Sequence, residues 1–375
     1  MVREDLEGRN ILGILPTGAG KSLCFQLPAA IADGGATIVV TPLIALMEDQ
    51  DRRARERGLR ATYISHTLGK GEVFVRCSDS IKQPPHLLYV APERLISEGF
   101  ADVLSRMPIR RIVVDEAHCI DQWIEYRPAY SEIGAIVESL GVPVSAFTAT
   151  ASRRTRNLIK ASLRMEPCGA HIGSFDRPNL RYEVIKKWPR VGDHILSLLK
   201  YTTPGGAGVI YRTTRQEVED TWRMLVANNV NCLPYHAGLQ PELRSYNQGM
   251  FLTGKCNVIV ATIAFGMGID KPDIRWVIHA DMPSSVEGYF QEAGRAGRDG
   301  RPATCYMLWS NGDIPKVRAF ADRMENPAYR EQAYDRIRCL IGYANDKKCR
   351  RRYLLRYFGE IIEPCGNCDL CGKEG

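Results

Sequence analysis

The chain has 375 residues, of which 45% are hydrophobic and 25% are charged, so it has enough material for two or three hydrophobic cores. Its net charge of +7 suits a polyanionic partner, although such a surplus is also common in proteins that bind no nucleic acid. The sequence lacks both an apolar run of the roughly 18 residues that span a bilayer and the pattern of a secretory signal. We therefore expect a multidomain cytoplasmic protein without a membrane partner.

Short β-branched runs recur along the chain, and each is followed by a turn and a helix-like stretch. The first series occupies residues 11–15, 37–41, 86–90, 112–114 and 144–148, and a second series occupies residues 208–211, 258–261, 276–279 and 303–308. Alternating strands and helices are typical of a parallel sheet that is covered on both faces. The sequence therefore predicts two α/β domains in tandem, with similar folds.

The segment between the two series contains turn residues and has no helical period, so we place the linker near residues 175–190. From about Met324 the sequence becomes basic and helical, and it ends in a cysteine cluster. This tail is too short for another sheet domain and needs a staple. The predicted domains are residues 1–180, residues 181–325 and a small module of residues 326–375.

The segment Leu15-Pro-Thr-Gly-Ala-Gly-Lys-Ser22 lies between a predicted strand and an apolar helix. In such a loop, backbone N–H groups cradle phosphates, a lysine reaches the β- and γ-phosphate oxygens, and a serine hydroxyl ligates Mg²⁺. The candidate nucleotide-binding residues are Thr17, Gly18, Gly20, Lys21 and Ser22. The alternative is a glycine turn before an ordinary helix, which the Gly-Lys-Ser order after a strand disfavours.

The segment Val113-Val-Asp-Glu-Ala-His118 is a predicted buried strand that ends in two carboxylates. Ligands bind at the carboxyl ends of the strands in open α/β sheets. Asp115 is placed to hold Mg²⁺ through water, and Glu116 to orient or deprotonate the attacking water. The two acids belong to a helix N-terminus in the alternative interpretation, but a position about 95 residues after a phosphate loop favours hydrolysis.

In Gln291-Glu-Ala-Gly-Arg-Ala-Gly-Arg298, two arginines are spaced i and i+3, so they share one face if the segment is helical. From the second domain, Arg295 and Arg298 are candidates to reach the γ-phosphate of a bound nucleotide and stabilise the charge of the transition state. A solvated basic helix, with glycines for close packing, remains the alternative.

The spacing Cys349-x₁₅-Cys365-x₂-Cys368-x₂-Cys371 provides four thiolates, which are enough for a closed structural zinc site. Such a site would fold the tail. Free thiols and an iron–sulfur cluster are the alternatives. The basic residues next to the first cysteine would offer a face to DNA phosphates; they are Lys347, Lys348, Arg350, Arg351 and Arg352.

Together these segments resemble the RecQ family of DNA helicases over nearly the whole chain. Further matching segments are Thr41-Pro-Leu-Ile-Ala-Leu-Met-Glu-Asp-Gln50, Ala91-Pro-Glu-Arg-Leu95, His118-Cys-Ile-Asp-Gln-Trp123, Phe147-Thr-Ala-Thr-Ala151, Ser174-Phe-Asp-Arg-Pro-Asn179, Tyr235-His-Ala-Gly-Leu239 and Ala261-Thr-Ile-Ala-Phe-Gly-Met-Gly-Ile-Asp270. The Asp-Glu-Ala-His-Cys sequence, followed by Gln-Trp and a terminal cysteine cluster, is specific to this family. The resemblance implies two RecA-like domains and a zinc-binding module.

The resemblance also implies roles for individual residues. Lys21, Ser22, Asp115 and Glu116 would bind and hydrolyse MgATP, Arg298 would be the arginine finger, and Gln291 and Arg295 would line the cleft. The segment 148–150 would couple hydrolysis to DNA, while Thr41, Pro42, Arg94, His236 and Thr262 would contact the phosphodiester backbone. An aromatic loop with Trp123, Tyr126 and Arg127 would relay single-strand binding to the ATPase; the alternative for Trp123 is a core position.

The sequence departs from the family pattern in three places. Counting back from Lys21 to the family's adenine-recognising aromatic–Arg–Gln segment passes Met1, which leaves room for a start codon upstream. The aromatic loop is shorter than usual and has Ile124-Glu-Tyr126 where the family has a histidine. The chain also stops after the zinc cysteines, before the winged-helix and HRDC domains. The resemblance therefore supports translocation more directly than unwinding.

We accordingly expect an ATP-dependent 3′→5′ DNA helicase or translocase that acts in DNA repair and recombination. It would use ATP, Mg²⁺ and Zn²⁺, bind single-stranded or 3′-tailed DNA as a monomer, and associate with the nucleoid. Two other hypotheses stay open. One is a catalytically impaired protein that binds DNA without unwinding it, and the other is an RNA helicase, which the cysteine cluster disfavours.

Overall fold

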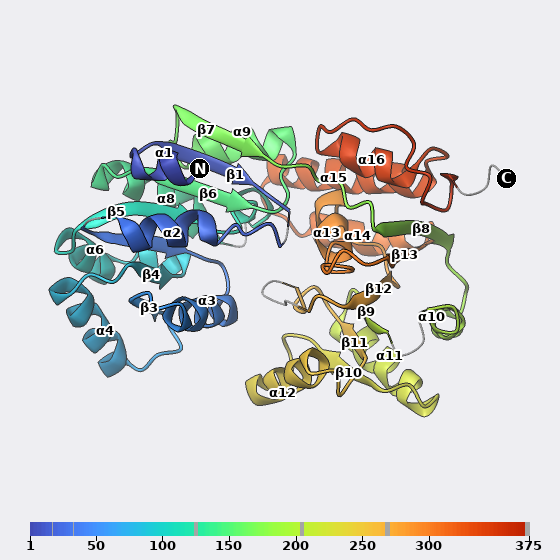
Figure 1. The fold of residues 1–375 in the computed structure, drawn as a ribbon. Coiled ribbons are helices and arrows are strands. Elements are labelled where there is room, and N and C mark those ends of the chain that lie inside the picture. The colour runs from blue at the N-terminus through green and yellow to red at the C-terminus, as the bar shows by residue number, and fades with distance from the viewer. Residues whose placement is uncertain (17, 33, 124–126, 203–205, 267–270, 372–375) are drawn as a thin grey trace. The chain divides into compact units, whose positions relative to one another are not determined.

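The computed structural model describes the whole chain except residues 17, 33, 124–126, 203–205, 267–270 and 372–375 (Figure 1). The chain divides into two compact units, Met1–Phe175 and Asp176–Gly375. Each unit has its own sheet and its own core, so each is described by itself. None of the helices in the described part of the chain combines the length and the apolar character that crossing a membrane requires.

The first unit is built on a seven-stranded parallel sheet with the order β3-β4-β2-β5-β6-β1-β7. Its strands are β1 (Asn10–Ile14), β2 (Ala36–Val40), β3 (Ala61–Ile64), β4 (Leu87–Val90), β5 (Ile109–Val114), β6 (Val144–Thr148) and β7 (Cys168–Ile172). Its helices are α1 (Val2–Leu6), α2 (Leu23–Ile31), α3 (Ile44–Glu56), α4 (Lys70–Lys82), α5 (Pro92–Leu95), α6 (Glu98–Ser105), α7 (Cys119–Gln122), α8 (Ala129–Leu140) and α9 (Arg153–Ser162).

The order of the strands determines which helices cover which face. The chain moves in one direction across the sheet from β1 to β2 and on to β3, and in the other direction from β3 to β7. Because crossovers between parallel strands are right-handed, α2 and α3 lie on one face and α8 and α9 on the opposite face (Figure 1). Phe25 and Met47 from the first pair of helices pack on Val39, Tyr89 and Phe147 of the sheet.

A buried ion pair holds α1 against the amino ends of the strands. The side chain of Arg111, on β5, is fully buried and lies 2.9 Å from the carboxylate of Asp5 on α1. The same guanidinium donates hydrogen bonds to the backbone oxygen of Asp5 and to the hydroxyl of Ser145 on β6. Burial lowers the pKa of Arg111 to about 10, and the opposing charge of Asp5 limits this fall.

The second unit contains a six-stranded parallel sheet with the order β10-β11-β9-β12-β13-β8. Its strands are β8 (Leu180–Lys186), β9 (Ala207–Tyr211), β10 (Cys232–Tyr235), β11 (Val258–Ala261), β12 (Ile274–His279) and β13 (Ala303–Trp309). Its helices are α10 (Val191–Leu199), α11 (Arg215–Ala227), α12 (Pro241–Leu252), α13 (Val286–Ala293), α14 (Asp313–Asp322), α15 (Pro327–Asn345) and α16 (Arg350–Tyr357). Helix α15 precedes the first cysteine of the C-terminal cluster, Cys349, and α16 lies between Cys349 and Cys365.

The two sheets share one topology. Strands β1 to β6 of the first unit follow the same spatial order as β8 to β13 of the second, and β7 is an addition at the edge. This confirms the prediction of two similar parallel-sheet domains, which are RecA-like. One prediction is wrong: residues 180–186 belong to strand β8 and not to a linker. Its turn-rich neighbours and its alternating exposure concealed the strand.

Candidate nucleotide and nucleic-acid site

The predicted phosphate loop connects β1 to α2, which begins at Leu23. Gly18 and Gly20 have φ angles of +89° and +81°, a region that residues with a β-carbon rarely adopt. The ammonium group of Lys21 donates a hydrogen bond to the backbone oxygen of Leu15 at 3.3 Å, so this side chain lies along the loop. Ser22 is the N-cap residue of α2. Thr17 lies outside the described residues.

The carboxylate of Asp115 lies directly after β5, at the carboxyl end of the sheet. Its two oxygens accept hydrogen bonds from the side-chain amide of Gln50 at 2.8 Å and from the backbone N–H of Glu116 at 3.0 Å. Burial, together with the charge of Glu116, raises the pKa of Asp115 to about 6. A buried carboxylate with neutral donors is a site that a cation would stabilise, and its oxygen ligands suit Mg²⁺.

Glu116 has a φ angle of +51°, which is uncommon for a residue other than glycine and places its side chain differently from that of a strand residue. One of its carboxylate oxygens lies 3.3 Å from Nδ1 of His118, and the same nitrogen lies 2.9 Å from the hydroxyl of Thr148. Burial disfavours a charged imidazole, but Cys119 and Glu116 raise the pKa of His118 on balance. The hydroxyl of Thr148 also donates a hydrogen bond to the backbone oxygen of Thr150. His118 thus connects the predicted hydrolytic acid to the 148–150 segment.

Arg127 joins three of the segments that the resemblance assigns to DNA binding. Its guanidinium forms a two-pronged ion pair with Glu93 and donates to the backbone oxygen of Pro42 at 2.6 Å. It also lies 5.6 Å from the ring centre of Trp123, which is partly buried. Each of the three guanidinium nitrogens of Arg127 therefore has an acceptor within the protein. Tyr126, the other predicted member of the aromatic loop, lies outside the described residues.

The remaining candidates for DNA contact in the first unit differ in exposure. The side chains of Thr41 and Pro42 are buried, whereas Arg94, on α5, is partly exposed. The backbone N–H of Thr41 bonds to the backbone oxygen of Val90, which ties β2 to β4. Among these residues, Arg94 is the one whose side chain is open to a ligand.

In the second unit, α13 ends at Ala293, and residues 294–299 form consecutive turns. The condition under which Arg295 and Arg298 would share a helix face is therefore not met. Helix α13 ends before both arginines, at its C-cap residue Gly294, and Gly297 between them has a left-handed φ angle of +56°. Arg295 is buried, while Gln291 and Arg298 are partly exposed. Part of the Gln291 and Arg298 side chains is therefore accessible at the surface of this unit.

The predicted backbone-binding residues of the second unit lie after β10 and β11. Both ring nitrogens of His236 are occupied: Nε2 lies 2.9 Å from a carboxylate oxygen of Glu219, and Nδ1 accepts from the backbone N–H of Gly238. This side chain is buried and positions the loop around it. Thr262 is partly exposed, and its hydroxyl accepts a hydrogen bond from the backbone N–H of Ala264.

The four C-terminal cysteines form one cluster. The sulfur atoms of Cys349, Cys365, Cys368 and Cys371 all lie within 4.8 Å of one another. Four thiolates around tetrahedral zinc, with Zn–S bonds of about 2.3 Å, lie about 3.8 Å apart. Although burial opposes it, hydrogen bonds from the backbone N–H groups of Arg352 and Cys365 lower the pKa of Cys349 to about 7. The residues present therefore fit a structural zinc ion.

Two of the five basic residues around Cys349 do not form an exposed face. Arg350 and Arg351 are each about 5% exposed, and both are occupied inside the unit. Arg350 pairs with Asp369 at 3.0 Å and donates to the backbone oxygen of Tyr343, at the end of α15. The prediction of a basic surface therefore does not hold for these two arginines, whose burial tightens the module.

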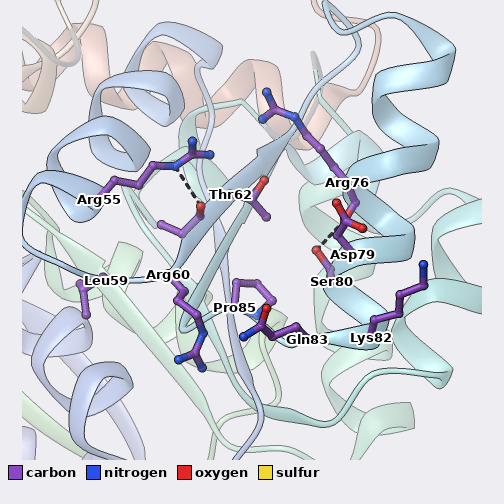
Figure 2. Close-up of a pocket in the computed structure, with 11 residues that line it drawn as sticks. Arg55, Leu59, Arg60, Thr62, Arg76, Asp79, Ser80, Lys82, Gln83 and Pro85 are labelled. Carbon is purple, nitrogen blue, oxygen red and sulfur yellow. Dashed lines mark hydrogen bonds between the residues drawn. The ribbon is translucent and has the colours of Figure 1, made fainter.

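One pocket of the first unit lies apart from the predicted site. It has a volume of about 570 Å³ and contains none of the predicted site residues (Figure 2). Arg55 and Arg76 flank it and donate hydrogen bonds to the backbone oxygens of Ala61 and Tyr63 on β3. Strand β3 is an edge of the sheet, so these arginines satisfy carbonyl groups that lack a partner strand.

Three family models match the chain in the order of its folded parts. They describe a DEAD/DEAH box helicase over residues 1–158, a helicase conserved C-terminal domain over residues 191–300 and a RecQ zinc-binding region over residues 311–372. A protein of Acanthamoeba polyphaga mimivirus, named as an ATP-dependent RNA helicase, is 37% identical over 99% of this chain and 68% of its own length. This chain belongs to the RecQ family.

Relatives that are named as RecQ helicases are longer than this chain. The ATP-dependent DNA helicase RecQ of Bacillus subtilis is 38% identical over 97% of this chain and 62% of its own length. A RecQ-like DNA helicase of Caenorhabditis elegans is 38% identical over 98% of this chain and 39% of its own length. The chain thus spans less than two thirds of these relatives.

Solved structures support the fold. Yeast Dbp5 bound to RNA and ADP BeF3 has a TM-score of 0.65 and 16% identity, and the match covers 88% of this chain and 89% of that chain. The Mycobacterium smegmatis helicase Lhr, bound to single-stranded DNA and AMP-PNP, has a TM-score of 0.64 and 21% identity, over 86% of this chain and 47% of that chain. At these identities, the likeness concerns the fold alone.

Gln50 was not assigned a role from the sequence, although it ends one of the matching segments. The structure places its amide on Asp115, and the side chain is 8% exposed. The burial of Gln50 is not visible in the sequence, so only its place at the end of a matching segment could have pointed to it.

Proposed function

We propose that this RecQ protein is a DNA-dependent ATPase that steps along single-stranded DNA in the 3′→5′ direction and acts in DNA repair and recombination. The observation that carries the proposal is the convergence of Lys21, Asp115 and Glu116 at the carboxyl end of the first sheet, next to a glycine-rich loop. Lys21 would bind the β- and γ-phosphates of ATP, and Glu116 would orient the attacking water.

Ser22 and Asp115 would hold Mg²⁺, which supplies neutralisation of the phosphate oxygens when it is bound. Gln50 would keep the Asp115 carboxylate in one orientation. His118, between Glu116 and Thr148, would transmit a change at the hydrolytic acid to the 148–150 segment. This chain of contacts supports a coupling between ATP hydrolysis and nucleic-acid binding.

The second unit would contribute Arg298 as the arginine finger, with Arg295 and Gln291 at its side. Their charge would stabilise the transition state, an effect for which related arginines contribute about 10³- to 10⁵-fold in rate. Single-stranded or 3′-tailed DNA would contact Arg94, Thr262 and the loop around Trp123, mainly through sequence-independent contacts with its backbone. Translocation requires that these contacts alternate with the state of the nucleotide.

Steady-state ATP turnover, with and without single-stranded DNA, tests the proposal. The wild-type chain is expected to hydrolyse ATP faster when DNA is present, and both Lys21→Ala and Glu116→Gln should reduce the stimulated rate by about 100-fold or more. Lys82→Ala changes an exposed lysine of the distant pocket and serves as the matched control. Full stimulated turnover in Glu116→Gln would contradict the proposal. If the wild-type chain bound DNA but did not hydrolyse ATP, the result would instead support a catalytically impaired DNA-binding protein.

RNA is the second candidate substrate, because the mimivirus relative is named as an RNA helicase. The four-cysteine cluster and the named DNA helicases among the relatives favour DNA. Competition between DNA and RNA oligonucleotides of the same sequence, in the stimulated ATPase assay, separates the two. Stronger competition by RNA would reverse the assignment.

A further inference from the structure

The segment 176–180, Asp-Arg-Pro-Asn-Leu, opens the second unit and leads into β8. It has no role in the site described above, yet its side chains and backbone are held from two directions. One set of contacts reaches the turns of residues 294–301, which carry Arg295 and Arg298. The other set reaches the zinc module.

Arg177 fixes the backbone of the arginine-bearing turns. Its Nη1 atom donates to the backbone oxygen of Gly294 at 3.3 Å, and its Nη2 atom donates to those of Ala296 and Gly297 at 3.0 and 2.7 Å. The three carbonyl groups belong to the residues on either side of Arg295 and directly before Arg298. One guanidinium therefore spans the whole turn.

Asn179 holds the same turns at a second point. Its side-chain amide donates to the backbone oxygens of Gly297 and Arg301 at 2.8 and 2.9 Å. A β-carbon at Gly297 would lie only 2.5 Å from this amide nitrogen, so the contact leaves no room for a side chain there. The glycine before Arg298 is thus required by the packing of Asn179 as well as by its φ angle.

The other side of the segment is bound to the zinc module. Arg351 is buried, and its Nη2 atom donates to the backbone oxygens of Pro178 and Leu180 at 3.0 and 2.6 Å. Its Nε atom lies 3.5 Å from a carboxylate oxygen of Asp176. The amide of Asn367 donates to Pro178 as well, at 3.4 Å.

These partners lie next to the zinc ligands in the sequence. Arg351 follows Cys349 by two positions, and Asn367 lies between Cys365 and Cys368. The backbone of Cys368 itself forms an isolated β-bridge with that of Tyr182 on β8. Metal coordination that fixes the cysteines therefore also fixes the donors that hold the segment 176–180.

We propose that Arg177 and Asn179 are positioning residues for Arg298, and that Arg351 connects their segment to the zinc module. Zinc would then serve hydrolysis at a distance, by holding the turns of residues 294–301 in the geometry that the arginine finger requires. The inference rests on the proposed role of Arg298. It assigns no contact with substrate to Arg177, Asn179 or Arg351.

The first test measures kcat and KM for ATP at saturating single-stranded DNA. Arg177→Ala and Asn179→Asp, which keeps the shape of asparagine but loses its donors, are each expected to lower kcat by about 10- to 100-fold. KM for ATP should stay within about twofold, because the phosphate loop is unchanged. Arg181→Ala, which loses a partly exposed pair with Glu183 in strand β8, should keep the wild-type kcat.

Each variant is then combined with Arg298→Ala. If Arg177 and Asn179 act through Arg298, the double variants should be no slower than Arg298→Ala alone. A wild-type kcat in both single variants, or losses that multiply with that of Arg298→Ala, would overturn the positioning role. A wild-type kcat in Arg298→Ala would instead overturn the proposed finger, so the two failures are distinguishable.

The link to the zinc module is tested by comparing Arg351→Ala with Arg356→Ala, since Arg356 is exposed on the same helix, α16. Metal analysis should find equal zinc in both proteins. Hydrogen exchange of residues 294–301 should accelerate only in Arg351→Ala, with a fall in kcat of about 2- to 30-fold. Unchanged exchange in Arg351→Ala, or a loss of its zinc, would overturn the link.

Discussion

The two units place different chemistry at the same position of a shared topology. In the first unit, Asp115 follows β5 and receives hydrogen bonds from neutral donors. In the second unit, Asp281 follows the equivalent strand β12 and pairs with Lys187 at 3.2 Å and with Arg212 at 2.8 Å. One carboxylate is left for an external cation, whereas the other is neutralised by cations of the chain itself.

The two units also differ in the helices that follow β2 and β9, the strands next to β5 and β12 in the two sheets. The N-cap residue of α3, after β2, makes no side-chain hydrogen bond to the helix. Helix α11, after β9, has a complete capping box in which Thr214 and Glu217 satisfy each other's backbone N–H groups. The second unit thus closes with its own side chains the positions that the first unit leaves open. Equal folds therefore need not mean equal binding sites.

Replacing each of the two equivalent aspartates gives the largest expected contrast. Asp115→Asn should lower stimulated ATP turnover by about 100- to 1,000-fold and leave the melting temperature at least as high, because a buried charge is removed. Asp281→Asn should leave kcat per folded molecule within about threefold but lower the free energy of unfolding by about 1–3 kcal/mol, since Lys187 and Arg212 each lose one of two carboxylate partners. Turnover assays and thermal melting measure both effects. A loss of stability in Asp115→Asn together with a loss of turnover in Asp281→Asn would contradict the proposed difference between the two units.

Metal removal should also separate the units. Chelation of zinc is expected to destabilise the second unit, because Cys368 of the cluster forms a β-bridge with Tyr182 of β8, an edge strand of its sheet. ATP binding by the first unit should persist within about twofold in affinity. Titration with a chelator, followed by metal analysis, hydrogen exchange and nucleotide binding, checks the expectation. Equal loss of protection in both units would contradict it.

Arg127 gives a smaller effect that is confined to the first unit. Arg127→Ala is expected to reduce DNA stimulation of the ATPase by about tenfold, since it removes the cation next to Trp123 and the contacts with Pro42 and Glu93. ATP turnover without DNA should change little. Arg106→Ala, which breaks an exposed pair on α6, is the control. Unchanged stimulation by DNA in Arg127→Ala would show that Arg127 does not contribute to the coupling between DNA and the ATPase.

The smallest expected effect concerns the capping box of the second unit. Burial alone would raise the pKa of Glu217, but the hydrogen bond from Lys316, the charge of Arg212 and the contacts with Thr214 lower it to about 2. Its stabilising contribution is therefore complete above its ordinary pKa of 4.5 and is lost as the pH falls towards 2. Thr214→Ala should cost about 1 kcal/mol of stability at pH 7. Urea unfolding at several pH values measures it, and no cost at pH 7 would show that the cap is unimportant.

The central strands of both sheets were predictable from the sequence, and the edges were not. Strands such as β2 and β9 are buried at every position and read as apolar runs. The four strands that the sequence did not reveal, β3, β7, β8 and β10, are the four edges of the two sheets. Each has partly exposed positions, so its hydrophobic pattern is weak.

The candidate site shows a similar division. Lys21, Asp115 and the four cysteines follow from local motifs, because the chemistry depends on residues that are close in sequence. The contacts of Gln50 with Asp115, and of Arg177 with residues 294–297, join positions far apart in the chain. No local pattern encodes such contacts. The same limit explains why the sequence suggested a basic surface at Arg350 and Arg351, which are instead buried and form hydrogen bonds inside the unit.

We infer that, of the two units, the first alone binds a nucleotide at the carboxyl edge of its sheet. Calorimetric titration with MgAMP-PNP tests it directly, using the wild-type chain, Lys21→Ala and Lys187→Ala, which change the lysines that follow β1 and β8. We predict one binding site per chain, lost in Lys21→Ala and retained in Lys187→Ala. Two sites in the wild-type chain, or binding that survives in Lys21→Ala and disappears in Lys187→Ala, would contradict the claim.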